Sequence, residues 1–114
     1  MRADHVSAPL IAALRRTLGA GTELIETHLS WLLLAGDEAY KLKKPLTLDF
    51  VDFASPEQRR AACEEELRIN RRTAPHLYLG VVPVTGPPDA PQLGGSGQPM
   101  DWAVHMRRFP ADAL

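Results

Sequence analysis

The chain of 114 residues has room for one domain, and its 45% hydrophobic and 24% charged residues are ordinary for a globular protein. Thirteen basic and fourteen acidic residues leave a net charge of −1, which argues against nucleic acid or an anionic membrane surface as a partner. The one cysteine excludes an intrachain disulfide, and no apolar run approaches the ~20 residues that span a bilayer, so we expect a cytoplasmic protein.

The first predicted element is a helix over residues 7–18. Its apolar side chains recur at the three- and four-residue spacing of a helix with one buried face. Ser7 is a suitable N-cap, Pro9 suits a first turn, and Gly19 would end the helix. We therefore expect a helix with one apolar face before the first strand.

Three short strands are predicted next, over residues 23–27, 29–35 and 39–43. The second is nearly continuous apolar sequence closed by the turn signal Gly36-Asp37, which is typical of a buried strand. The third alternates with a period of two, so Ala39, Lys41 and Lys43 share one face and the large apolar residues share the other. This strand therefore presents two ammonium groups on the same side.

A connector over residues 46–54 leads to the strongest helix signal, over residues 55–73. Ser55 followed three residues later by Gln58 forms a capping box, and Pro56 occupies the first helical position. We expect this segment to be the main helix of the domain.

After this helix the sequence predicts a strand over residues 77–84 and another over 102–106, with a tail over 107–114. The segment between the two strands, 85–100, is rich in Gly and Pro and is expected to be a flexible loop. The order predicts an α+β fold: a five-stranded antiparallel sheet, one main helix and an N-terminal helix, in a single domain over 1–114.

Lys41 and the acidic run at 64–66 are the most suggestive charged groups. In protein kinases a lysine on the third strand holds the α- and β-phosphates of ATP, and a helix glutamate fixes its ammonium group. Here Lys41 lies on the third predicted strand, and the acidic run lies on the helix that follows. The alternative is that Lys41, Lys43 and Lys44 form a solvated strand edge that discourages aggregation.

Three strings carry a resemblance to a known family: AYKLKKP at 39–45, EEELRINRR at 64–72 and MRRFP at 106–110. With the sequence around them, from about residue 10, they resemble the start of aminoglycoside phosphotransferase-like proteins. Some members of that family carry a second, P-loop kinase domain further along the chain. The resemblance implies a protein-kinase-like fold, represented here by its amino-terminal lobe, and ATP as the bound nucleotide.

The resemblance also implies roles for the charged residues. Lys41 would contact the phosphates, with Lys43 as the alternative because it shares the same face. Glu66 would be the helix partner of the lysine, and Glu65 and Glu64 remain open because each residue step rotates a side chain by about 100° around the helix.

Two further segments would contact the nucleotide. The turn at 26–30 falls where kinases place a glycine-rich phosphate loop, but it has no glycine, so the hydroxyls of Thr27 and Ser30, with backbone N–H groups, would cap a phosphate instead. The alternative is an ordinary turn between strands. The hinge whose backbone would hydrogen-bond adenine falls at Met106, Arg107, Arg108 and Phe109.

Phosphoryl transfer also needs an aspartate that orients the acceptor hydroxyl, and further side chains that bind Mg²⁺. The resemblance places these in a carboxy-terminal lobe, and we expect Mg²⁺ only with that lobe. The sequence thus predicts a partial domain that binds ATP, is inactive alone, and has the missing lobe or a partner chain as its partner. It would be a fragment, a split or decayed gene product, or a stand-alone lobe. The alternative is a non-catalytic α+β interaction module, or a truncated relic, that binds no nucleotide.

The remaining candidates have simpler interpretations. The run at 94–97 is glycine-rich but lacks the Lys-Ser/Thr and the helix that follow a nucleotide loop, so it is interpreted as a linker. Cys63 is interpreted as a small buried hydrophobe on the main helix. No metal-ligand spacing joins the four histidines, at positions 5, 28, 76 and 105.

Overall fold

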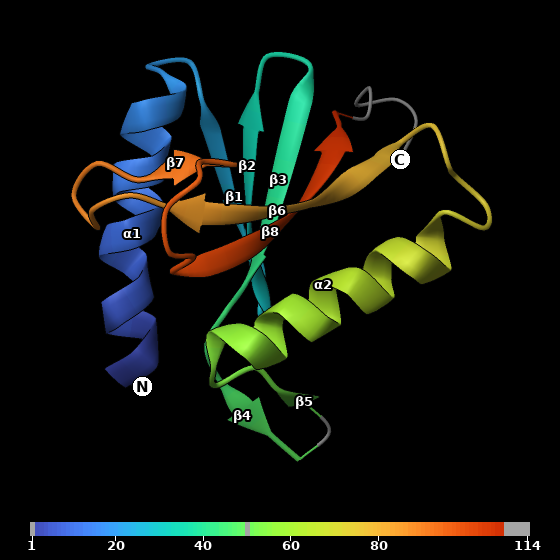
Figure 1. The fold of residues 1–114 in the computed structure, drawn as a ribbon, viewed down its shortest axis with the longest axis horizontal. Coiled ribbons are helices and arrows are strands. Elements are labelled where there is room, and N and C mark those ends of the chain that lie inside the picture. Colours follow the sequence, from blue (N-terminus) through green and yellow to red (C-terminus); the bar gives the residue numbers. More distant parts are fainter. Residues whose placement is uncertain (1, 50, 109–114) are drawn as a thin grey trace.

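The computed structural model describes residues 2–49 and 51–108, with side chains from residue 8 onward. It has an α+β fold in which two helices lie against a curled antiparallel sheet of six strands (Figure 1). The helices are α1 (Arg2–Leu18) and α2 (Pro56–Asn70). The strands of the sheet are β1 (Glu23–Glu26), β2 (Ser30–Ala35), β3 (Glu38–Lys43), β6 (Tyr78–Thr85), β7 (Gln92–Leu93) and β8 (Asp101–Arg107).

The strands lie in the order β1-β2-β3-β8-β6-β7, and every neighbouring pair is antiparallel. β3 is therefore an interior strand, and Lys41 lies in register between Leu32 of β2 and Val104 of β8. The interpretation of the three lysines as a solvated strand edge is wrong, because both edges of β3 are already paired. The lysines must then be explained by what lies on the face of the sheet.

The predicted five-stranded sheet is corrected in two places. β7, inside the predicted loop over 85–100, adds a sixth strand by pairing with the end of β6. The predicted connector over 46–54 contains a separate two-stranded ribbon of β4 (Thr47–Leu48) and β5 (Val51–Asp52). Both strands of the ribbon, and β7, have only two residues, too few for an alternating pattern to mark them in the sequence.

Part of the 85–100 segment packs closely on β6. A Cβ atom placed on Gly95 would lie 2.3 Å from the hydroxyl oxygen of Thr85, so only glycine allows this approach. Pro91 is fully buried, although the sequence predicts a flexible loop here. Tertiary contacts, which local composition does not reveal, give this segment its structure.

α2 begins as the sequence predicts. The Ser55 hydroxyl accepts a hydrogen bond from the Gln58 N–H at 3.1 Å, and the Gln58 side chain accepts one from the Ser55 N–H at 2.9 Å. The helix ends at Asn70, three residues before the predicted end at 73. The capping box therefore fixes the residue at which α2 begins.

α1 begins at Arg2, so the prediction of a start at Ser7 is wrong, and Pro9 lies inside the helix. A proline inside a helix removes one backbone donor, and the turns on both sides of Pro9 remain helical here. In the described part of the chain, neither helix is long and apolar enough to cross a membrane.

The two helices cover opposite faces of the sheet, because alternate residues of β3 belong to different apolar clusters. The α1 face is filled by Ile11, Leu14, Trp31, Leu33, Leu42, Val84 and Ala103. The α2 face is filled by Ala39, Cys63, Val104 and Met106. Since Ala39, Lys41 and Lys43 share a face, the two lysines lie on the α2 side.

α2 is anchored to the sheet at its first turns by a buried ion pair. The Arg59 Nε donates to Asp101 Oδ1 at 3.0 Å, and its Nη1 donates to the carbonyl oxygens of Phe53 and Ala54 at 2.9 and 3.1 Å. This anchor holds the helix across β8 and β6 and so places its later turns opposite β3.

Candidate functional site

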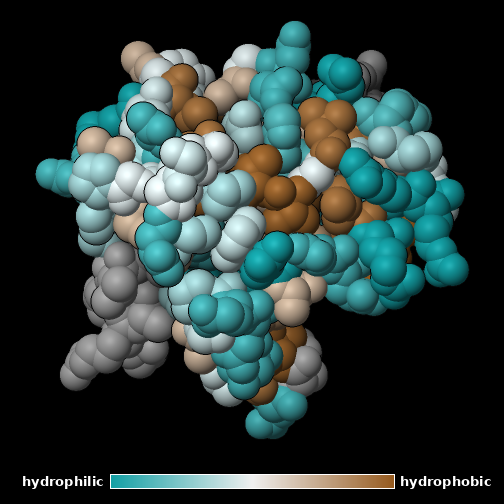
Figure 2. All heavy atoms as spheres, viewed as in Figure 1, coloured by the Kyte–Doolittle hydropathy of each residue, from teal (hydrophilic) through white to brown (hydrophobic). Residues whose placement is uncertain are grey.

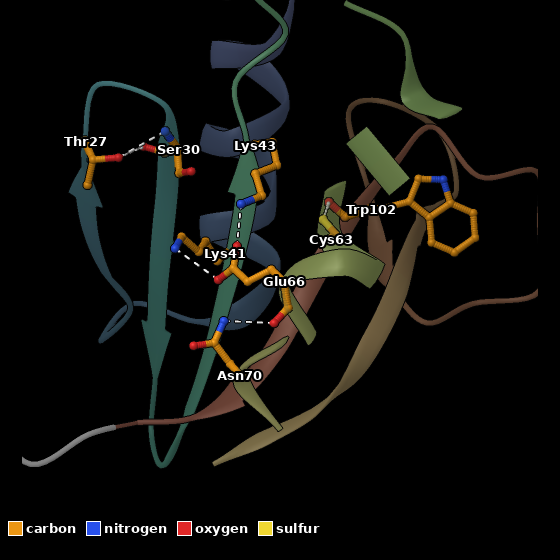
Figure 3. A network of polar contacts seen from close by, with 8 residues as sticks. All are labelled: Thr27, Ser30, Lys41, Lys43, Cys63, Glu66, Asn70 and Trp102. Atoms are coloured by element: carbon orange, nitrogen blue, oxygen red, sulfur yellow. Dashed lines mark hydrogen bonds and ion pairs between the residues drawn. The ribbon is translucent and has the colours of Figure 1, made fainter. Parts of the chain in front are cut away.

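Both lysines of β3 contact one glutamate of α2 (Figure 3). The Lys41 Nζ lies 3.1 Å from Glu66 Oε2, and the Lys43 Nζ hydrogen-bonds the other carboxylate oxygen, Oε1. The Asn70 side chain donates to the backbone carbonyl of Glu66 at 2.8 Å, within the last turn of the helix. We call Lys41, Lys43 and Glu66 the lysine–glutamate cluster.

Of the three glutamates that the sequence leaves open, Glu66 is the one on the sheet-facing side of α2. Glu64 pairs with Arg60 at 3.0 Å, and Glu65 accepts from the Arg68 Nε at 3.1 Å, both on the exposed side of the helix. One residue step of about 100° is enough to separate these positions, which is why only the packed helix selects among them.

The lysine–glutamate cluster is unequally exposed. The Lys41 side chain is 33% exposed, whereas those of Lys43 and Glu66 are 12% and 13% exposed. Burial alone would raise the pKa of Glu66, but hydrogen bonds and charge from Lys43 and Lys41 outweigh it, so the pKa lies below its ordinary value. Glu66 is therefore an anion with two cations beside it, and Lys41 is the cation that faces outward.

An open hollow of about 360 Å³ lies next to the lysine–glutamate cluster. It is lined by Thr27, His28, Leu29, Ser30, Lys41, Lys43 and Phe53. We call it the turn hollow, because the turn between β1 and β2 supplies three of these residues and the first residue of β2 a fourth. The Lys43 Nζ lies 5.8 Å from the centre of the Phe53 ring, so this lysine is held by both a carboxylate and an aromatic face. An anion in the turn hollow would meet Lys41 and Lys43 together.

The structure brings Thr27 and Ser30 to the turn hollow, as the phosphate-capping hypothesis requires, but Thr27 also closes the turn itself. Its hydroxyl accepts from the Ser30 N–H at 3.0 Å and lies 3.2 Å from the Ser30 carbonyl oxygen, which also accepts the Thr27 N–H at 2.8 Å. Figure 3 shows the Thr27 side chain directed across the turn toward Ser30. The Thr27 hydroxyl therefore already makes hydrogen bonds within the turn, and a phosphate would compete for them.

The predicted hinge residues lie at the end of β8. Met106 is buried on the α2 face beside Ala39, and the N–H groups of Arg107 and Arg108 donate to the carbonyls of Leu77 and Asp37 at 2.9 and 2.8 Å. Phe109, the fourth predicted hinge residue, lies outside the described residues. These two backbone donors are thus engaged within the chain, and adenine recognition by them stays a prediction.

Apolar side chains extend the α2 face beyond the cluster. Figure 2 shows apolar atoms gathered over the strands next to α2. Ile25 of β1 is 45% exposed and pairs in register with Leu32, which is half-buried beside Leu34. The sequence reasoning did not identify this apolar surface, because it appears only when β1 and β2 are placed side by side.

His28, one of the four histidines, and Phe53, in the predicted connector over 46–54, also line the turn hollow, although the sequence predicts no ligand contact for either. The signal available for His28 was its position at the tip of a turn next to Thr27. Within residues 2–49 and 51–108, no group of three or more His, Cys, Asp or Glu side chains could hold a metal ion.

The prediction for Cys63 is confirmed. It lies on α2 with no exposed surface, and its Sγ is 3.9 Å from the Trp102 carbonyl oxygen. Burial raises the pKa of the thiol to about 12, so it stays protonated at neutral pH and takes no part in the chemistry of the cluster.

The chain is similar to uncharacterized proteins of Mycobacterium bovis and of two strains of Mycobacterium tuberculosis, CDC 1551 and H37Rv. Each is 43% identical over 84 residues, a stretch that covers 74% of this chain. The matched stretch covers only 15% of the length of each of these relatives. No family model and no solved structure matches the chain.

Proposed function

We propose that this chain is the ATP-binding amino-terminal lobe of an aminoglycoside phosphotransferase-like small-molecule kinase. The observation that carries the proposal is the ion pair between Lys41 of β3 and Glu66 of α2, 3.1 Å apart. A lysine on a third strand, fixed by a glutamate of the next helix, is the arrangement with which kinases hold the α- and β-phosphates of ATP.

The order of elements supports the same proposal. Counting the long strands alone, the first three lie side by side, the fifth (β8) follows the third, and the fourth (β6) lies beyond it. The helix that carries Glu66 is inserted between the third and fourth of these strands. This agrees with the kinase-like lobe that the resemblance implies, in which the sheet and one helix form one side of a nucleotide cleft.

The electrostatics of the cluster suit a polyphosphate. Two ammonium groups and one carboxylate leave a formal surplus of one positive charge, and Lys41 carries it to the more exposed side. Glu66 holds the Lys41 ammonium in place, so less rotamer freedom is lost when a phosphate binds. The half-exposed Ile25, with Leu32 and Leu34, offers an apolar surface on the same face for the base of a nucleotide.

The catalytic aspartate and the Mg²⁺ ligands would belong to a second lobe. The described residues hold no candidate metal cluster, and a kinase needs both features for phosphoryl transfer. The shared stretch covers 15% of the length of each relative, which leaves room in those proteins for a second lobe. This chain would therefore contribute nucleotide binding and not the acceptor site.

The test is an ATP titration of the 114-residue chain in magnesium-free buffer. Binding is monitored through the chemical shifts of the backbone amides in NMR spectra, which detect weak binding. We expect ATP to shift amides of β3 and of the turn before β2, and we expect Lys41→Met to remove these shifts. Lys44→Met is the matched control, because Lys44 pairs with Glu26 at 2.6 Å and does not contact Glu66. Equal binding by the wild type and Lys41→Met, including equally negligible binding, would overturn the proposal.

A second candidate is a non-catalytic interaction module. The lysine–glutamate cluster is complete without a ligand, and the partly exposed Ile25 offers an apolar contact for another protein. In that case ATP would produce no shifts, and Lys41→Met would change only the stability of the chain.

A further inference from the structure

We propose that His28 binds the terminal phosphates of the nucleotide and thereby replaces the backbone of a glycine-rich loop. This inference rests on the proposed function and adds to it the residue that distinguishes ATP from nucleotides with fewer phosphates. His28 is exposed at the tip of the turn between β1 and β2 and lines the turn hollow together with Lys41 and Lys43.

The register of the sheet places the cationic side chains in sequence. Lys41 lies opposite Leu32 and Lys43 opposite Ser30, the first residue of β2, so the tip with His28 lies beyond Lys43. Two residues of a strand span about 7 Å between Cα atoms, so Lys41, Lys43 and the tip with His28 follow one another along the hollow, while the two ammonium groups meet at Glu66. A chain of phosphates that meets the ammonium groups can therefore continue toward His28 at the tip.

The turn between β1 and β2 is held in place by hydrogen bonds within the chain. The Lys44 N–H donates to the Leu29 carbonyl at 2.8 Å, which ties the tip to the end of β3, and Thr27 closes the turn from within. Among the described residues only glycines have positive φ, so the turn has ordinary backbone geometry. Glycine loops approach phosphates through backbone N–H groups, whereas this turn also presents the exposed imidazole of His28 to the hollow. The side chain of His28 is therefore a donor that a glycine loop lacks.

The charged groups around the tip leave His28 available. Glu66 of α2 is occupied by Lys41 and Lys43, and Glu26 at the end of β1 is paired with Lys44. In the parts of the chain that the structure describes, no carboxylate forms an ion pair or hydrogen bond with His28. The imidazole can therefore donate a hydrogen bond to a phosphate oxygen, as a neutral ring or as a cation.

The experiment compares ATP with AMP, which lacks the terminal phosphates, by NMR titration of the 114-residue chain. We expect His28→Ala to weaken ATP binding about tenfold, as for the loss of one hydrogen bond to a charged group, and to leave AMP binding unchanged. His28→Lys, which returns a cationic donor, should recover most of the ATP affinity. His76→Ala is the matched control, because His76 is also exposed and does not line the turn hollow.

Circular dichroism checks that each variant is folded, which we expect because His28 is exposed and supports no core contact. Unchanged ATP binding in His28→Ala, together with its loss in Lys41→Met, overturns this inference and leaves the proposed function standing. An equal loss of ATP and AMP binding in His28→Ala also overturns it, because a terminal-phosphate contact cannot affect AMP. If the wild type binds no ATP, both proposals fail together.

Discussion

α2 carries two ion-pair sites that differ in kind. Near its start, Arg59 and Asp101 are both buried, and the guanidinium also donates to two backbone carbonyls, so every strong partner lies within the chain. Two turns later, Glu66 meets two lysines, one of them 33% exposed beside a hollow. The first site is saturated and holds the fold together. The second has a surplus cation and an opening, which is what a ligand site needs.

The two carboxylates also differ in electrostatics. For Asp101, burial raises the pKa above its ordinary value despite the opposing charge of Arg59. For Glu66, the two lysines outweigh burial and the pKa falls. At Asp101 the charge of one cation thus does not fully offset the effect of burial on the pKa, whereas at Glu66 the two lysines do.

The largest expected effect is at the saturated site. Arg59→Leu leaves the Asp101 carboxylate buried without its partner, and we expect it to lower the free energy of unfolding by about 3–5 kcal/mol. Denaturant titration measures this change. Arg60→Leu is the matched control on the next residue, where the ion pair with Glu64 is exposed and should contribute about 0–1 kcal/mol. Equal losses in the two variants would contradict the structural role of Arg59.

At the cluster, Glu66→Gln keeps the shape of the side chain and removes the charge that two lysines share. We expect a loss of about 1–3 kcal/mol, because the poorly exposed Lys43 loses its anion. Glu64→Gln, on the exposed side of the same helix, should change the stability by a few tenths of a kcal/mol. If the two variants are equally stable, Glu66 does not hold the cluster together.

The lowered pKa of Glu66 gives this site a pH dependence. A carboxylate with a depressed folded pKa contributes stability above its unfolded pKa of ~4.3 and loses it as the pH falls through the folded pKa. The wild type should therefore lose more stability than Glu66→Gln as the pH falls from about 5 through the folded pKa of Glu66. Urea titrations at several pH values measure the difference. Parallel curves for the two proteins would show that Glu66 is not the acid-sensitive group.

Among the residues of the two ion-pair sites, the smallest expected effect on stability is at Lys41, whose removal should matter most for binding. Because its side chain is 33% exposed, solvent screens the pair, and Lys41→Met should cost less than about 1 kcal/mol. Glu66 would still keep Lys43 as its partner. A thermal melt tests this expectation. A loss as large as that of Arg59→Leu would make Lys41 a structural residue like Arg59 and would remove the contrast between the two sites.

Much of the fold follows from local patterns. The capping box of α2, the alternation of β3 and the turn signal at Gly36, which has a positive φ of 60°, all appear in the structure as predicted. The failures have two causes. β7 and the two strands of the ribbon pair with near neighbours in the sequence but are too short to show a period. The start of α1 lies upstream of a plausible cap.

The sequence by itself determined that an alternating strand presents two lysines on one face and that a capped acidic helix follows it. Tertiary structure alone decided three things. It selected Glu66 over its neighbours, because the packing of α2 on β8 sets the rotation of the helix. It made β3 an interior strand, because β8 returns from more than sixty residues away to pair with it. It also brought His28 to the lysines, because the hollow between a turn and a strand exists only once both are folded.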